Sequence, residues 1–137
     1  MKDRRFIVAW SFLLIVVSAG CSHDSGITTT KVEALIAREV SANADKSQVL
    51  AFLDAHRLAH SGIVEFPQGY LEDPEFDTDL SSDKLRGKVG RVKRYAVAKI
   101  PNIKSGLLET HDLFIKFYFD EDDRLVEYLV RSVGRGL

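Results

Sequence analysis

The stretch Leu113-Phe114-Ile115-Lys116-Phe117-Tyr118-Phe119 alternates between large apolar side chains at its odd-numbered positions and a mixed set at its even-numbered ones. This alternation is typical of a β-strand with one face in a hydrophobic core, because successive side chains of a strand point to opposite faces. The acidic segment 120–123 follows, and then a second run rich in Val and Tyr from Leu125 to Val133. Two such strands joined by a short polar segment predict an antiparallel hairpin.

A third strand is predicted upstream of this hairpin, where residues 92–100 alternate loosely. Residues 101–109, which contain Pro101 and Ser105-Gly106, are expected to form a longer loop between the third strand and the hairpin.

Two amphipathic helices are predicted before the strands. Thr30-Lys31-Val32-Glu33 matches a capping box, and apolar residues recur at helical spacing over residues 31–40. Asp45-Lys46-Ser47-Gln48 offers a second helix start, and that helix is expected to carry His56 and His60 and to end before Gly62.

The order of these elements predicts the fold class. Three antiparallel strands cannot bury both faces by themselves, so amphipathic helices must cover one face. We therefore predict a single α+β domain, residues 30–137, in which two N-terminal helices pack on one face of a three-stranded antiparallel sheet as a two-layer sandwich. Leu113, Ile115, Phe117 and Phe119 are expected on the covered face, and Phe114 and Tyr118 on the face near water.

The composition is that of an ordinary globular protein. The chain has 137 residues, 19 Lys and Arg against 20 Asp and Glu, and a hydrophobic fraction of 45%. These values exclude collagen, extended disorder and a polytopic membrane protein. The single cysteine excludes an intrachain disulfide and any multi-cysteine metal centre.

The N-terminus has the pattern of a secretory signal peptide, residues 1–20. A basic head, residues 2–5, precedes an uninterrupted apolar stretch over residues 6–17. Twelve helical residues rise about 18 Å, well short of the ~30 Å hydrocarbon core of a bilayer. The length therefore favours a cleaved signal over a transmembrane anchor.

Val17-Ser18-Ala19-Gly20-Cys21 resembles a bacterial lipobox. The resemblance implies that Cys21 receives a diacylglycerol and a further acyl chain such as palmitate, and that residues 21–29 form a lipidated, flexible tether. Ser22 in the next position implies the periplasmic leaflet of the outer membrane, with the inner membrane less favoured. The alternative is an ordinary signal peptide cut near Ala19 or Gly20, which leaves an unmodified Cys21.

Charge is strongly segregated in the middle of the chain. Seven acids and no base lie in residues 63–83, and six bases with no acid follow. These six are candidates for contact with anionic lipid headgroups: Lys84, Arg86, Lys88, Arg91, Lys93 and Arg94. The alternative, which we favour, is that the acidic segment folds across the bases and neutralises them.

The chain carries no recognisable catalytic motif. His56 and His60 have the spacing of two metal ligands, but no third ligand accompanies them, and we predict neither a metal nor another cofactor. A G-x-S-x-G sequence and a phosphate-binding glycine loop are also lacking. From the lack of these motifs we predict a non-enzymatic protein. We also predict that it does not bind nucleic acid, because the chain without its signal is acidic and exported.

Two helices followed by a three-stranded sheet on a lipid-anchored chain resemble the BamE/SmpA-like lipoproteins. The segment 117–126, Phe-Tyr-Phe-Asp-Glu-Asp-Asp-Arg-Leu-Val, carries the best local similarity to that family's strand, acidic turn and strand. The resemblance implies a protein-binding or scaffold module in outer-membrane barrel assembly or envelope maintenance, with Phe114, Tyr118 and Tyr128 as contact residues for an envelope protein partner. The competing hypothesis is a tethered periplasmic ligand-binding or inhibitor module.

Overall fold

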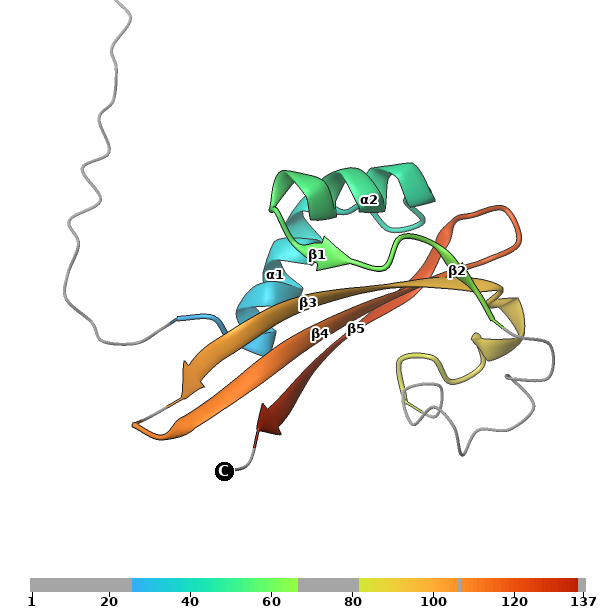
Figure 1. Ribbon diagram of the computed structural model, residues 1–137. Helices are drawn as coiled ribbons and strands as arrows, with labels where there is room; N and C mark the ends of the chain where they lie inside the picture. The colour runs from blue at the N-terminus through green and yellow to red at the C-terminus, as the bar shows by residue number, and fades with distance from the viewer. Residues whose placement is uncertain (1–25, 67–81, 106, 136–137) are drawn as a thin grey trace, which may run out of the picture.

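Three long antiparallel strands form the centre of the fold (Figure 1). The computed structural model describes residues 26–66, 82–105 and 107–135. In chain order the long strands are β3 (Arg94–Ser105), β4 (Glu109–Phe119) and β5 (Leu125–Arg135). The predicted hairpin is confirmed, because β4 and β5 pair across the acidic turn.

Two short strands, β1 (Ala59–His60) and β2 (Val64–Glu65), both pair with β3 on the side away from β4. The α+β class and the antiparallel sheet are thus confirmed, but the predicted number of three strands is wrong. The sheet has five, in the order β1-β3-β4-β5 with β2 also on β3. Two-residue strands have no periodicity of their own and form only because the edge of β3 offers hydrogen-bonding groups.

The helix α1 (Thr29–Glu39) begins earlier than predicted. Thr28, not Thr30, is its N-cap, and the Thr28 hydroxyl accepts a hydrogen bond of 3.2 Å from the Lys31 amide. An N-cap side chain satisfies an amide that the first helical turn leaves without a partner. The first helix therefore starts before residue 30.

The helix α2 (Lys46–Ala55) has the predicted capping box. The Asp45 carboxylate accepts from the Gln48 amide at 3.0 Å, and the Gln48 side chain accepts from the Asp45 amide at 3.0 Å. The helix ends sooner than expected, however: His56 is its C-cap and His60 lies in β1. The prediction that both histidines share this helix is wrong, because the chain turns at Arg57, where φ is 55°.

One face of the sheet and both helices contribute to a single buried cluster. Leu113, Ile115, Phe117 and Phe119 of β4 are each 0% exposed, as predicted for the covered face. The same cluster contains Val32 and Ile36 from α1, and Val49, Phe52 and Leu53 from α2. The helical apolar positions are therefore buried together with the odd-numbered positions of β4.

The opposite face of the sheet has a cover that the sequence did not predict. Leu85 and Val92, on either side of the short 3-10 helix η2 (Val89–Arg91), are 0% exposed and form a second buried cluster with Tyr118. Phe66, which directly follows β2, also packs there, with its ring 6.3 Å from that of Tyr118 and nearly parallel to it. The expectation that Tyr118 lies near water is therefore wrong.

The β3–β4 hairpin is longer than predicted, because β3 continues through Pro101 to Ser105. The strands change register between Ile100 and Ile103, and Asn102 has a φ of 59°. Asp112, only 5% exposed, stabilises this irregularity: its carboxylate accepts the Asn102 amide at 2.9 Å and lies 3.1 Å from Lys99 Nζ. Residues 101–105 and 109 thus belong to strands rather than to the loop predicted over 101–109.

Candidate functional surface

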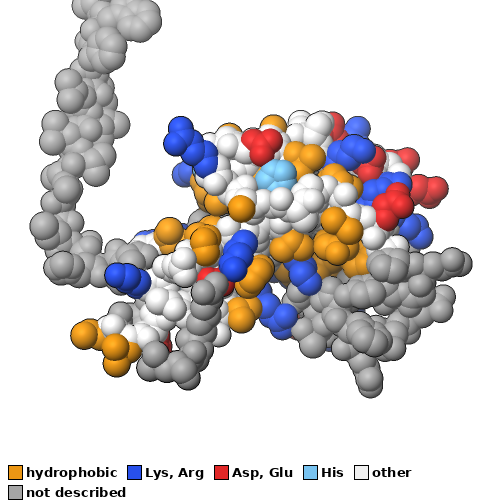
Figure 2. All heavy atoms as spheres, in the orientation of Figure 1, with side chains coloured by type: hydrophobic (Ala, Val, Ile, Leu, Met, Phe, Trp, Pro, Cys, Tyr) orange, Lys and Arg blue, Asp and Glu red, His pale blue; other side chains and the backbone are white. Residues whose placement is uncertain are grey.

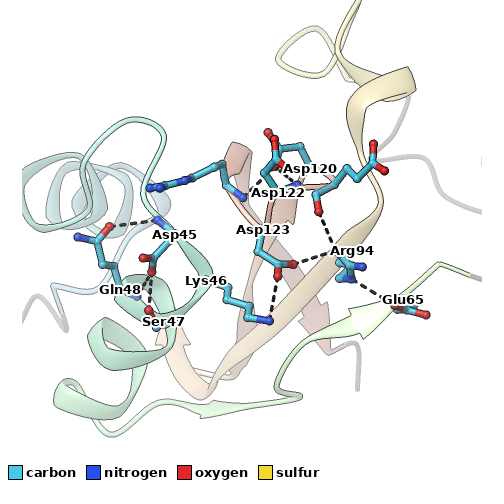
Figure 3. A network of polar contacts seen from close by, with 11 residues as sticks. Asp45, Lys46, Ser47, Gln48, Glu65, Arg94, Asp120, Asp122 and Asp123 are labelled. Atoms are coloured by element: carbon cyan, nitrogen blue, oxygen red, sulfur yellow. Dashed lines mark hydrogen bonds and ion pairs between the residues drawn. The ribbon is translucent and has the colours of Figure 1, made fainter.

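A polar network ties α2 to one end of the sheet (Figure 3). The Asp123 carboxylate, in the turn between β4 and β5, lies 2.9 Å from Lys46 Nζ and 2.9 Å from Arg94 Nη1. Arg94 also reaches Glu65 of β2 at 3.2 Å. Four separate elements meet in these contacts, so the network fixes the ends of the strands relative to α2.

The charges in this network shift one another's protonation. The hydrogen bond from Lys46, together with the charge of Arg94, holds the pKa of the Asp123 carboxyl below its ordinary value. The hydrogen bond to Glu65 and the charge of Asp123 raise the pKa of Arg94. Both shifts favour the charged forms, as expected for opposite charges in contact.

The Asp120 carboxylate accepts hydrogen bonds from backbone amides of the same turn. Asp120 Oδ1 accepts from the Asp122 amide at 3.0 Å and from the Arg124 amide at 2.9 Å, an arrangement typical of an Asx turn. The acidic segment 120–123 is thus a structural turn, in which the Asp120 carboxylate and two backbone hydrogen bonds hold the chain.

The basic run is paired with acids from several parts of the chain. Lys84 meets Glu33 of α1 at 3.1 Å, and Lys88 meets Glu127 of β5 at 2.9 Å. The acidic segment itself supplies Asp83 to Arg86 at 2.6 Å and Glu65 to Arg94. Its other acids lie outside the described residues.

Arg91 and Lys93 are exposed, and within the described ranges no ion pair joins either of them to an acid. Contact between the basic run and anionic lipid stays a prediction. Lys84, Lys88 and Arg94 reach toward α1, β5 and β2 respectively, so the basic run does not form one group of free cations.

The two histidines each contact a separate carboxylate. His56 Nε2 lies 2.6 Å from Glu39 Oε2 at the end of α1, and His60 Nε2 lies 2.8 Å from Asp54 Oδ1 of α2. The hydrogen bond from His56 lowers the pKa of the Glu39 carboxyl. In the part of the chain that the structure describes, no group of three or more metal-ligating side chains comes together.

The three predicted contact residues lie in different environments. Phe114 is half-buried on the face away from the helices, and Lys99 Nζ lies 5.5 Å from its ring centre. Tyr118 is buried on that face beneath Leu85 and Val92. Tyr128 is half-buried on the helix-covered face, and its hydroxyl donates to the Glu33 carbonyl at 3.4 Å.

A second group of cations, which the sequence analysis missed, lies along the uncovered part of the sheet. The strand register places Lys99 and Arg131 on either side of Phe114, Lys116 two residues further along β4 on the same face, and Lys104 toward the other end of that face. Two acids occupy sheet positions on this face, and both are paired: Asp112 with Lys99 and Glu127 with Lys88. The sequence held one signal for this group: Lys99, Lys116 and Arg131 lie in predicted strands at positions that alternate with core residues.

None of the described helices is both long and apolar enough to cross a membrane. Cys21 and the predicted signal peptide lie outside the described residues. The chain matches no protein-family model, and neither a curated protein nor a solved structure shows significant similarity to it.

Proposed function

We propose that this chain is a non-enzymatic lipoprotein, anchored through acyl chains on Cys21 in the periplasmic leaflet of the outer membrane, whose domain binds an envelope protein partner. The observation that carries the proposal is the lipobox-like sequence Val17–Cys21, placed behind a basic and apolar leader. A short polar segment separates Cys21 from α1, so the anchor would keep the domain close to the membrane surface.

The sheet supplies a surface suited to a protein partner. The long strand β5 pairs with β4 along one side, and within the described residues its other edge pairs with no further strand. Exposed strand edges accept partner segments by adding a strand to the sheet. Phe114 and the 44% exposed Val133 provide apolar contact area nearby, since Phe114 lies opposite Arg131, two residues before Val133.

The use of the ionisable side chains supports a structural role. Among the described residues, ion pairs join neighbouring elements. Examples are the pair of His56 with Glu39 and the pair of Asp123 with Lys46. A partner contact through Tyr128 stays a prediction, and the Tyr128 hydroxyl also donates to the Glu33 carbonyl of α1.

The biological process is part of the same proposal. Two helices, an antiparallel sheet and an acidic turn between its last strands are features shared with BamE/SmpA-like lipoproteins. From this resemblance we propose a role in outer-membrane barrel assembly or envelope maintenance.

The anchor is tested by the variant Cys21→Ala. Fatty-acid labelling of the wild-type protein and its loss in this variant, together with release of the domain from membranes, would support the proposal. Equal membrane retention of both proteins would contradict it. Ser22→Ala is the matched control, because it changes the neighbouring residue and leaves the thiol in place.

The partner surface is tested by a photo-crosslinking amino acid at Phe114 or Val133, with the exposed Ala51 of α2 as control site. The proposal predicts the same envelope protein from both sheet positions and none from Ala51. Failure to recover any envelope protein from the sheet positions would contradict a scaffold role.

A further inference from the structure

Two neighbouring leucines at the end of the β3–β4 hairpin are the most exposed large apolar side chains of the described residues. Leu107 is 101% exposed and Leu108 is 73% exposed. They follow Ser105 at the end of β3 and precede Glu109, where β4 begins, so they form the tip of a long hairpin (orange at the lower left of Figure 2). Exposed apolar surface is an interaction site where further apolar or charged groups adjoin it.

The tip lies at the opposite end of the sheet from the polar network. Successive turns of an antiparallel meander alternate between the two ends, and the turn with Asp123 is at the other one. The connection from α1 to α2 is fixed at that other end, where the Ala44 carbonyl accepts the Leu125 amide at 2.7 Å. The helix α1 therefore runs toward the network, and its first residue lies on the side of the tip (Figure 1).

The chain thus enters the domain from the same end that carries the leucines. Ile27, just before α1, is itself 46% exposed and adds apolar surface on that side. Lys104, one residue before the end of β3, is exposed next to the tip. The register places Lys104 on the face that also carries Lys99, Lys116 and Arg131, and of these four cations Lys104 lies closest to the tip.

A lipid bilayer is the partner that fits this combination. Apolar side chains with flanking cations bind at the boundary between headgroups and acyl chains, about 5–10 Å below the surface. Residues 22–26 reach at most about 18 Å when fully extended. An anchor on Cys21 would therefore hold the tip end of the sheet facing the membrane.

We propose that Leu107 and Leu108 insert into the phospholipid surface that holds the anchor, with Lys104 against the lipid phosphates. This inference rests on the proposed function for the anchor and adds the orientation of the domain. The acyl chains supply the affinity for the membrane, and the inserted tip sets the orientation of the domain. In this orientation the strands run away from the membrane, and the edge of β5 and the Phe114 face are open to partners from the side.

The tip is tested with tryptophan as a depth reporter. The single tryptophan of the chain is Trp10, in the predicted signal peptide, so the chain that begins at Cys21 contains none. Leu108→Trp places one at the tip, and Glu121→Trp places the matched control in the exposed turn at the opposite end of the sheet. The purified, membrane-derived proteins are incorporated into vesicles of phosphatidylethanolamine and phosphatidylglycerol that contain brominated acyl chains.

The proposal predicts that Leu108→Trp loses most of its emission to the brominated chains and shifts to the blue, while Glu121→Trp keeps the emission of a solvated indole. Lys104→Glu, added to Leu108→Trp, should reduce the quenching on anionic vesicles, and Arg57→Glu, a reversal elsewhere on the surface, should leave it unchanged. A solvated emission from Leu108→Trp on the anchored protein would overturn the proposal.

Intact mass separates this outcome from a failure of the anchor itself. If the purified chain carries no acyl group, the anchor part of the proposed function fails. The free Cys21 thiol is then coupled to a maleimide lipid in the same vesicles, so that the domain is held by a tether of the same length. Quenching and emission wavelength are then measured for Leu108→Trp and Glu121→Trp as before, which tests the tip independently of the natural anchor.

Discussion

The buried cover over the second face of the sheet leads to the sharpest stability prediction, Leu85→Ala. Leu85 is 0% exposed and packs with Val92 and Tyr118, which are also 0% exposed. Removing three buried carbons forfeits about 2.4 kcal/mol of transfer free energy at ~0.8 kcal/mol per methylene. Incomplete collapse around the cavity adds to this, so we expect a loss of about 3 kcal/mol.

The matched control is Leu107→Ala, the same substitution at a side chain that is fully exposed. Surface substitutions of this kind change the unfolding free energy by no more than about 0.5 kcal/mol. Both variants are compared with the parent by urea unfolding, followed by far-UV circular dichroism, in the Cys21→Ala background, which leaves no thiol to acylate. The linear dependence of free energy on urea then gives the difference between them.

A loss for Leu85→Ala as small as that for Leu107→Ala would refute the packing described here. It would mean that residues 82–92 do not seal the face of Tyr118, and that this face is open as the sequence first suggested. A thermal scan provides an independent reading, because about 3 kcal/mol corresponds to a fall in Tm of roughly 10 °C for a domain of this size.

Three further predictions concern the hairpin and the polar network. Asp112→Ala removes the acceptor of the Asn102 amide and the partner of Lys99, and should lower the unfolding free energy by about 2 kcal/mol in a urea titration, whereas Thr110→Ala nearby should change it little. Asn102→Val should cost about 1–2 kcal/mol while Asn102→Gly is tolerated, because φ at this position is 59°; equal losses would contradict the bulge. Because the pKa of Asp123 and that of Asp45 are lowered in the folded state, their stabilisation is complete above the unfolded pKa and is lost as the pH falls through the folded one. The urea midpoint should therefore drop in acid below about pH 4, and Asp123→Asn should flatten that drop.

Local patterns in the sequence predicted the parts of the fold that depend on local chemistry. The alternation in β4 placed Leu113, Ile115, Phe117 and Phe119 in the core, and the acidic segment 120–123 identified the turn. The capping box of Asp45 and Gln48 located the start of α2. In each case the residues that decide the structure are neighbours along the chain.

The predictions that failed depend on distant contacts. Thr28, Thr29 and Thr30 are chemically equivalent as N-caps, so the sequence alone did not distinguish Thr28, which caps α1, from Thr30. β3 passes through Pro101 because Asp112, on the neighbouring strand, supports the irregularity at Asn102. The cover over Tyr118 was not predicted because Leu85 and Val92 lie within a segment rich in Lys and Arg, which gives no apolar periodicity.

The candidate surface shows the same division. The basic run was visible in the sequence as a block of like charge, but its partners Glu33 and Glu127 lie far away along the chain. Leu107 and Leu108 fell within the loop predicted over residues 101–109. The greater length of β3 and β4 places them at the tip of a hairpin, at the end of the sheet.

The most direct test of a lipid-anchored role is the intact mass of the protein purified from its native membrane. We predict a chain that begins at Cys21 and is heavier than its amino-acid sequence by a diacylglyceryl group and an acyl chain. A mass equal to that of the unmodified polypeptide, with a free thiol at Cys21, would contradict it.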